Sequence, residues 1–297
     1  MPGGRPGEAA GRLGDGAAGR LGDGAAGRMG AAGLTATGGG PTTTVSALRL
    51  ESAGASLDAT LVRPLGSAAT GTGRHGLVIC YGFPVSDTTA AGRGLGYAEL
   101  AERLAAETGW VVLTVSFRGM GESSGDFSLG GWLTDLKVAI DTCLSVAGVD
   151  SVWVCGFAAG GALALCAAGE DARIRGVAAL AAPADFGDRA GDARRFVAQA
   201  RAVGVIRDPK FPPDLDAWAR ELRDIRPLGL IGKIPPRPIL LVHGGNDEVV
   251  PLLDARALAD AAEGAVELRV LAGAGHRLRQ DPRAVALLIG WLDRQSH

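Results

Sequence analysis

The chain has 297 residues, 30 of them basic and 32 acidic, and its formal net charge of −2 gives no electrostatic reason to expect nucleic acid as a partner. Hydrophobic residues make up 47% of the chain, which is long enough for one large domain with a substantial core. No uninterrupted apolar stretch reaches the roughly 18 residues that span a bilayer, so we expect no membrane partner.

The first 43 residues differ from the rest in composition. An octad rich in Gly and Ala recurs at 15–22 and 23–30, with a variant at 8–14. Such a segment cannot bury enough apolar surface to offset its chain entropy. We predict a disordered tail over 1–43 that carries no site, followed by one domain over 44–297. Met29 inside the repeat is an alternative to Met1 as the natural start.

Ordered structure is expected to begin near Thr44. Residues 45–51 and 57–63 alternate between apolar and polar side chains in the manner of strands. The turn-prone segment 52–55 separates them. This pattern predicts an antiparallel hairpin at one edge of a sheet.

Apolar strand-like runs then alternate with helical patterns. The runs are 77–81, 110–117, 152–157, 177–181, 239–243 and 266–271. Continuous apolar strands separated by helices are typical of a parallel sheet that is covered on both faces. We therefore predict the α/β class, with a mostly parallel twisted sheet and helices on both faces.

Three helices can be placed by spacing and capping. One apolar face is formed by Tyr97, Leu100, Ala101 and Leu104, and another by Leu133, Leu136, Ile140 and Leu144. Asp281 is a candidate N-cap with Pro282 at the first position of the last helix. We expect these apolar stripes to pack in the core, and the last helix to close the sheet.

Between two of the predicted strands lies an insertion at 183–236. It is rich in Arg, Asp and Pro, with helical patterns at 192–203 and 215–222. Its Phe211, Pro212, Pro213 and Trp218 either line a substrate pocket or pack the insertion onto its own domain. The sequence leaves these two alternatives open.

The strand at 152–157 leads into a distinctive turn. The sequence VWVCGFAAGG at 152–161 has the strand, the sharp Gly-flanked turn and the small following residues of a nucleophile elbow, G-x-S-x-G. Ala158 occupies the central position, where the elbow carries serine. Every part of the motif is present except the hydroxyl.

Two later segments complete the pattern. They are HGGNDEVVP at 243–251 and GAGH at 273–276, in the chain order nucleophile position, acid, histidine. With these motifs the chain resembles the α/β-hydrolase superfamily, most closely its small-lidded esterase and serine-aminopeptidase-like members. The resemblance implies an α/β-hydrolase fold in which the insertion at 183–236 is a helical lid.

The resemblance also assigns roles to individual residues. Ala158 stands at the nucleophile position, His276 matches the general base and Asp247 matches the acid that orients it. Asp185 is a second candidate acid, and Asp247 has a structural alternative, the start of the turn before a helix near Pro251.

An oxyanion hole is implied beside these groups. Its two donors would be the backbone N–H groups of Ala159 and Phe83. Tyr81 precedes Gly82 where many relatives carry His-Gly, so the site departs from the family pattern at a second position. The segment RGMGESSG at 118–125 matches a family turn that is mainly structural.

Three interpretations of Ala158 remain open. The favoured one is a natural family member whose serine-hydrolase activity is lost or strongly altered, and which binds a small acyl or peptide-like ligand. The second is an active enzyme that uses His276 and Asp247 as a general-base dyad without an acyl-enzyme. The third is an engineered Ser-to-Ala form, which the second departure at Tyr81 disfavours.

Cofactors, metals and oligomeric state leave little trace in the sequence. The histidines, which are His75, His243, His276 and His297, show no paired ligand spacing, so we expect no metal and no cofactor. His243 is expected to pack or hydrogen-bond beneath the site. The cysteines, Cys80, Cys143, Cys155 and Cys166, lie in apolar runs without C-x-x-C spacing, which predicts buried, reduced thiols. A cytoplasmic location is expected because no apolar stretch is long enough to span a bilayer and the N-terminus lacks a continuous apolar h-region. Oligomeric state stays open.

Overall fold

The computed structural model describes residues 42–65, 74–84 and 96–296. All of them belong to one of the chain's two compact units, residues 40–297. The predicted tail over 1–43 lies outside the described residues except at its end, where the first strand already begins at Thr43. The alternative start at Met29 and the histidine at 297 also lie outside them.

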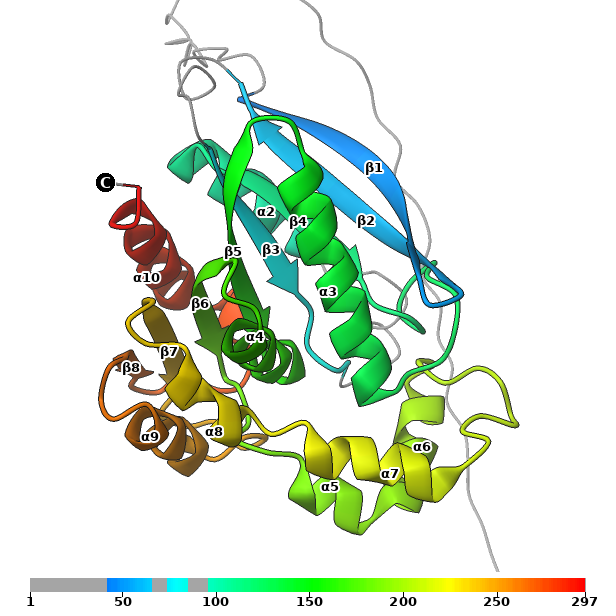
Figure 1. Ribbon diagram of the computed structural model, residues 1–297. Helices are drawn as coiled ribbons and strands as arrows, with labels where there is room; N and C mark the ends of the chain where they lie inside the picture. The colour runs from blue at the N-terminus through cyan, green and yellow to red at the C-terminus, as the bar shows by residue number, and fades with distance from the viewer. Residues whose placement is uncertain (1–41, 66–73, 85–95, 297) are drawn as a thin grey trace, which may run out of the picture. The chain divides into compact units, whose positions relative to one another are not determined.

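The described residues form an eight-stranded sheet with the order β1-β2-β4-β3-β5-β6-β7-β8 (Figure 1). The strands are β1 (Thr43–Ser52), β2 (Ala55–Pro64), β3 (Arg74–Cys80), β4 (Val111–Ser116), β5 (Val149–Phe157), β6 (Ile174–Leu180), β7 (Ile239–Gly244) and β8 (Glu267–Leu271). β1 pairs antiparallel with β2, and β2 with β4, while all the other pairings are parallel. The predicted edge hairpin and mostly parallel sheet are confirmed.

Helices cover both faces of this sheet. They are α2 (Tyr97–Thr108), α3 (Leu129–Ser145), α4 (Ala159–Glu170), α9 (Leu252–Ala261) and α10 (Pro282–Asp293). Apolar side chains of α2 and α10 share one core cluster, and those of α3 and α4 share the other. The predicted cap of the last helix is confirmed, because the Asp281 carboxylate accepts the Arg283 N–H.

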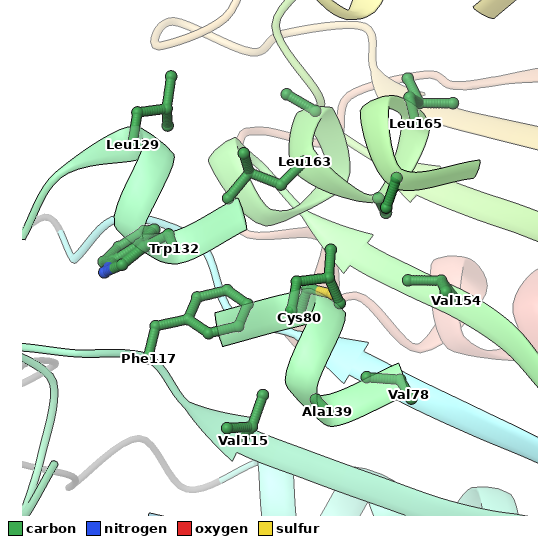
Figure 2. Packing of buried hydrophobic residues seen from close by; sticks show 14 of the residues in the cluster. Val78, Cys80, Val115, Phe117, Leu129, Trp132, Ala139, Val154, Leu163 and Leu165 are labelled. Atoms are coloured by element: carbon green, nitrogen blue, oxygen red, sulfur yellow. The ribbon is translucent and has the colours of Figure 1, made fainter. Parts of the chain in front are cut away.

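The alternation of strand β3 explains why the sheet needs two layers of helices. Leu77 and Ile79 lie in the cluster with α2 and α10, whereas Val78 and Cys80 lie in the cluster with α3 and α4. Successive side chains of a strand point to opposite faces, so an all-apolar strand must be covered twice. Figure 2 shows the second cluster, with Trp132 of α3 packed near Phe117.

Two expectations about packing need correction. The buried stripe of α3 is centred on Trp132, Leu136 and Cys143, so the predicted Leu133 and Leu144 lie at its margin, partly buried. β8 is an edge strand, and its Val270 is 44% exposed, so this strand is not buried on both faces. Its sequence carries the signal of a partly exposed strand, because Glu267 and Arg269 alternate with the apolar residues, and only one neighbouring strand, β7, pairs with it.

Four helices and a 3-10 turn lie between β6 and β7. They are α5 (Gly187–Gly191), α6 (Ala193–Ala202), α7 (Leu215–Asp224), α8 (Pro227–Leu230) and the turn η2 (Ile231–Lys233). Trp218 of α7 is buried and donates its indole N–H to the Phe127 carbonyl at 3.1 Å. Arg207 donates to the carbonyls of Gly119, Gly121 and Ser123. Trp218 therefore packs this segment onto the domain.

The RGMGESSG turn is structural, as expected. The Arg118 guanidinium pairs with the fully buried carboxylate of Asp135 at 2.6 Å. The buried Ser123 hydroxyl donates to the Ser116 carbonyl at 2.6 Å and accepts the Asp58 N–H at 2.8 Å. These bonds tie the turn to β2, β4 and α3, and they leave Ser123 no role as a replacement nucleophile.

The four cysteines are buried and free, as predicted. Burial raises the pKa of each thiol, that of Cys143 and Cys166 to about 12. Such thiols stay protonated and unreactive at neutral pH. In the part of the chain that the structure describes, no helix is long and apolar enough to cross a bilayer.

Candidate active site

The segments singled out in the sequence all follow parallel strands. Tyr81 to Phe83 follow β3, Ala158 follows β5, Asp247 lies beyond β7 and His276 beyond β8. Because these strands run parallel, their carboxyl ends meet at one edge of the sheet, where sites of open α/β folds are found. The topology therefore directs all four segments to the same edge.

The elbow between β5 and α4 has a strained backbone. Ala158 adopts φ 49° and ψ −122°, a region that residues with a side chain rarely occupy. Its N–H donates to the Leu180 carbonyl at 2.8 Å, and its own carbonyl accepts the N–H groups of Gly161 and Ala162. Bonds on both sides therefore hold Ala158 in this conformation. Strain of this kind persists only where the surrounding structure enforces it.

Glycines make the close approach around Ala158 possible. A Cβ on Gly156 would lie 2.2 Å from the Gly160 carbonyl oxygen, and a Cβ on Gly160 would lie 2.3 Å from the Tyr81 carbonyl oxygen. A Cβ on Gly82 would lie 3.1 Å from the Ala158 methyl group. The loop after β3 therefore packs directly against the elbow, as an oxyanion loop must.

His276 and Asp247 form a hydrogen-bonded pair. The His276 Nδ1 lies 2.9 Å from Asp247 Oδ2 and 3.2 Å from Oδ1. The Asp247 side chain is fully buried, and that of His276 is 15% exposed. A carboxylate only accepts, so the ring donates from Nδ1 and the lone pair of the neutral ring lies on Nε2. This is the tautomer that a general base requires.

The charge on Asp247 is stabilised by its surroundings. Burial alone would raise the pKa of this carboxyl group, but hydrogen bonds from His276 and from the N–H groups of Val250 and Val249 outweigh burial and lower it. Both N–H groups reach Oδ1 at 2.9 Å. Asp247 therefore shapes the turn before α9 and also accepts the hydrogen bond of His276, and its role as the acid of a catalytic site stays a prediction.

His243 lies beneath this pair, as expected. It is 1% exposed, and its Nε2 lies 2.9 Å from the Val250 carbonyl oxygen and 3.6 Å from Asp247 Oδ2. Since a carbonyl only accepts, Nε2 carries the proton and donates to Val250. The other candidate acid, Asp185, is exposed and accepts the Gly187 N–H at 2.7 Å within its own turn.

The predicted oxyanion donors lie on either side of the elbow. Ala159 is the first residue of α4, and the first N–H groups of a helix have no acceptor inside it. Phe83 follows Gly82, and its ring lies 5.1 Å from the rings of both Phe127 and Phe196. Phe83 therefore joins the loop after β3 to helix α6.

One contact was not foreseen from the sequence. Tyr97 was assigned to the core stripe of α2, but its hydroxyl accepts the Gly82 N–H at 3.3 Å. A hydroxyl at the start of an otherwise apolar face was the available signal. No group of three or more His, Cys, Asp or Glu side chains suited to a metal occurs among residues 42–65, 74–84 and 96–296.

A family model described as the Alpha/beta hydrolase family matches residues 75–287. The chain belongs to the α/β hydrolase family. The match begins within β3 and includes β4 to β8, the segment around Ala158 and the Asp247–His276 pair, so the fold and family expected from the motifs are confirmed. No curated protein sequence matches this α/β hydrolase.

Solved structures support the same fold. Est1E from Butyrivibrio proteoclasticus with bound ferulic acid aligns with a TM-score of 0.63 and 22% identity over 84% of this chain and 97% of that one. The Pyrococcus furiosus esterase Pf2001 aligns with a TM-score of 0.61 and 18% identity over 84% of this chain and 92% of that one. The α/β hydrolase GrgF from a Penicillium species aligns with a TM-score of 0.61 and 19% identity over 84% of this chain and 98% of that one. At these identities the likeness establishes the fold of this α/β hydrolase.

Proposed function

We propose that this α/β hydrolase has lost the covalent step of a serine hydrolase and binds a small acyl or peptide-like ligand at the retained site. One observation carries the proposal. Ala158 sits in the strained elbow conformation without a hydroxyl, while the His276–Asp247 hydrogen bond of 2.9 Å is intact. The base and its orienting acid are kept, and the attacking atom is missing.

The loss of catalytic rate expected without a serine favours a binding function over a catalytic one. Removing the serine from such a triad lowers turnover by about 10⁶-fold, and the remaining site retains about 10³-fold acceleration over water. That residual rate is too small for an ordinary metabolic hydrolase. The retained groups still suit recognition of a carbonyl oxygen by the N–H groups of Phe83 and Ala159.

The ligand is proposed to lie beside Phe83. This ring is partly buried and packs against the buried rings of Phe127 and Phe196. Est1E, which is similar in fold, was solved with ferulic acid, an aromatic acid. We assign residues 183–236 the role of a lid over the proposed site. The four buried free thiols are compatible with the cytoplasmic location that we propose.

A second candidate function uses the same pair as a catalyst. The Nδ1–H bond to Asp247 leaves the lone pair of His276 on Nε2, which suits removal of a proton from water. In that reaction His276 Nε2 takes a proton from water as the water oxygen attacks the ligand carbonyl carbon. The bond from this carbon to the leaving alcohol or amine then breaks, the imidazolium returns the proton to that leaving group, and no acyl-enzyme forms. The lowered pKa of Asp247 keeps a negative charge behind the imidazolium that results.

The second departure from the family pattern supports a natural origin for Ala158. Tyr81 stacks on Tyr97 with 3.7 Å between ring centroids and 13° between ring planes. A substitution made only to trap a substrate has no need of this stack. The region around the elbow is thus adapted to Tyr81, which favours a site that diverged at two positions.

Kinetics on short-chain p-nitrophenyl esters and aminoacyl nitroanilides test the proposal. We expect the wild type to be inactive and Ala158→Ser to gain turnover that His276→Ala then removes. Ala181→Ser is a matched control, because Ala181 also has a positive φ, 53°, after the neighbouring strand β6. It should stay inactive. Turnover by the wild type that is lost in His276→Ala would instead establish the general-base enzyme.

A further inference from the structure

Tyr97 contacts three of the four segments that build the proposed site. Its hydroxyl accepts the N–H of Gly82, the neighbour of Phe83. Its ring packs edge to face against that of Phe157, the neighbour of Ala158, with 5.7 Å between ring centroids. The Arg279 guanidinium carbon, three residues beyond His276, lies 4.5 Å from its ring centroid. A single side chain thus touches the oxyanion loop, the elbow and the histidine segment.

The ring of Tyr97 is held between two side chains. The chain has two tyrosines, and they stack on each other with 3.7 Å between ring centroids. Tyr81 at that distance fills one face of the Tyr97 ring, so Arg279 must lie over the other face. Stacking and cation–π contact of this kind fix a ring without a covalent link.

Gly82 is clamped between Tyr97 and the elbow. On one side, a Cβ at Gly82 would lie only 2.9 Å from the Phe157 carbonyl oxygen and 3.1 Å from the Ala158 methyl group. On the other side, the Gly82 N–H is bound by the Tyr97 hydroxyl at 3.3 Å. The backbone at Gly82 therefore has little freedom to rotate, and the peptide that bears the Phe83 N–H is fixed with it.

We infer that Tyr97 is a positioning residue, which holds the Gly82–Phe83 backbone so that the Phe83 N–H faces a ligand oxygen, and which links this loop to the histidine segment through Arg279. The inference rests on the proposed function because that function makes Phe83 an oxyanion donor. Tyr97 acts through backbone orientation and does not touch the ligand.

The test uses Tyr97→Phe, which removes the hydroxyl and keeps the stacked ring. The first readout is amide hydrogen exchange at Gly82 in the full chain with its natural Ala158. We expect exchange at Gly82 to become about tenfold faster, which corresponds to about 1.4 kcal/mol, because the N–H group loses its hydrogen-bond partner. Tyr81→Phe is the matched control: it removes the other tyrosine hydroxyl, which bonds to Thr114, and should leave Gly82 exchange unchanged.

The second readout is kinetic and uses Ala158→Ser as the background. Adding Tyr97→Phe should lower kcat about 10- to 100-fold and leave KM within about twofold, because a displaced oxyanion donor acts on the transition state. Unchanged exchange at Gly82 overturns the inference. So does equal acceleration throughout β3 and α2, which would mean general loosening, or an unchanged kcat in an active Ala158→Ser background.

The two readouts separate this inference from the proposed function. If Ala158→Ser is inactive, the proposed function fails, and the exchange comparison between Tyr97→Phe and Tyr81→Phe still decides whether Tyr97 holds the loop. If Ala158→Ser is active and Gly82 exchange does not respond to Tyr97→Phe, the proposed function stands and the role of Tyr97 is refuted.

Discussion

His276 donates a 2.9 Å hydrogen bond to a carboxylate of Asp247 that is completely shielded from solvent. A buried carboxylate is stable only when donors satisfy it, and Asp247 has three: the imidazole and the N–H groups of Val249 and Val250. The pair is therefore built into the turn between β7 and α9. Its geometry does not depend on a hydroxyl at residue 158.

Acid should weaken the fold partly through Asp247. The pKa of this carboxyl group is lowered, against the effect of burial, by its three hydrogen bonds. A lowered folded-state pKa contributes stability that is fully present above the unfolded pKa of about 3.9 and is lost as pH falls through the folded value. Urea unfolding at pH 7 and pH 3 should therefore show a smaller loss on acidification in Asp247→Asn than in the wild type. Asp185→Asn, which changes an exposed carboxylate, should lose as much unfolding free energy on acidification as the wild type. Equal losses in all three proteins would contradict a stabilising role for the Asp247 carboxylate.

Glycine at the elbow should stabilise the protein. Ala158 at φ 49° bears strain that glycine does not, and such positions cost about 1–3 kcal/mol. The greater chain entropy of unfolded glycine offsets about 0.5–1 kcal/mol of this. We expect Ala158→Gly to raise the free energy of unfolding by about 1 kcal/mol in urea titrations. Ala164→Gly, inside the same helix and fully buried, should lower it by at least as much. A loss of stability in Ala158→Gly would show that the elbow is not strained.

Alanine at Gly160 should be strongly destabilising. The added Cβ would lie 2.3 Å from the Tyr81 carbonyl oxygen and 2.8 Å from that of Cys80, both backbone atoms that cannot rotate away. We expect a loss of about 3 kcal/mol, the upper end for overpacking. Gly290→Ala in α10 is the control, since nothing lies within 4 Å of its Cβ, and it should be neutral or gain about 1 kcal/mol from helix propensity. Thermal unfolding measures the stability of both variants. Equal stabilities of Gly160→Ala and Gly290→Ala would refute the close packing of the loop after β3 on the elbow.

The buried ion pair of the RGMGESSG turn should be sensitive to loss of one partner. Asp135 is fully buried, and its Oδ1 lies 2.6 Å from both Arg118 Nη2 and the Ser52 hydroxyl oxygen. Asp135→Ala leaves the arginine without its carboxylate, which costs about 3–5 kcal/mol in such pairs. Glu107→Ala, which breaks an exposed pair with Arg103 on α2, should cost about 0.5 kcal/mol or less. Chemical unfolding gives the free energy of unfolding of both variants. Equal losses in Asp135→Ala and Glu107→Ala would contradict the importance of the buried ion pair.

The sheet was predictable because the carboxyl-terminal parts of its central strands are buried and apolar. β3, β5 and β6 are buried from Gly76, Val152 and Gly176 onwards, and their polar residues lie only before these positions. β8 differs, because Glu267 and Arg269 stand among its apolar residues and Val270 is 44% exposed. These charged residues were the sequence signal that the strand is not covered on both faces.

The site was predictable only where its parts have sequence motifs. Gly156 and Gly160 signal the elbow because close backbone contacts exclude a side chain there. The Asp247 and His276 positions follow from Gly-rich turns after strands. Tyr97 has no motif, because its bond to Gly82 depends on how α2 meets the loop after β3. A contact between distant segments leaves no local pattern, so it emerged only from the structure.

Covalent labelling with a fluorophosphonate shows whether the nucleophile is missing, because the reagent reacts with activated serines. We expect no labelling of the wild type, and stoichiometric labelling of Ala158→Ser at residue 158 that is lost when His276→Ala is added. Labelling of the wild type would show that another serine acts as nucleophile. Failure of Ala158→Ser to react, in a correctly folded protein, would show that the site lacks more than a hydroxyl.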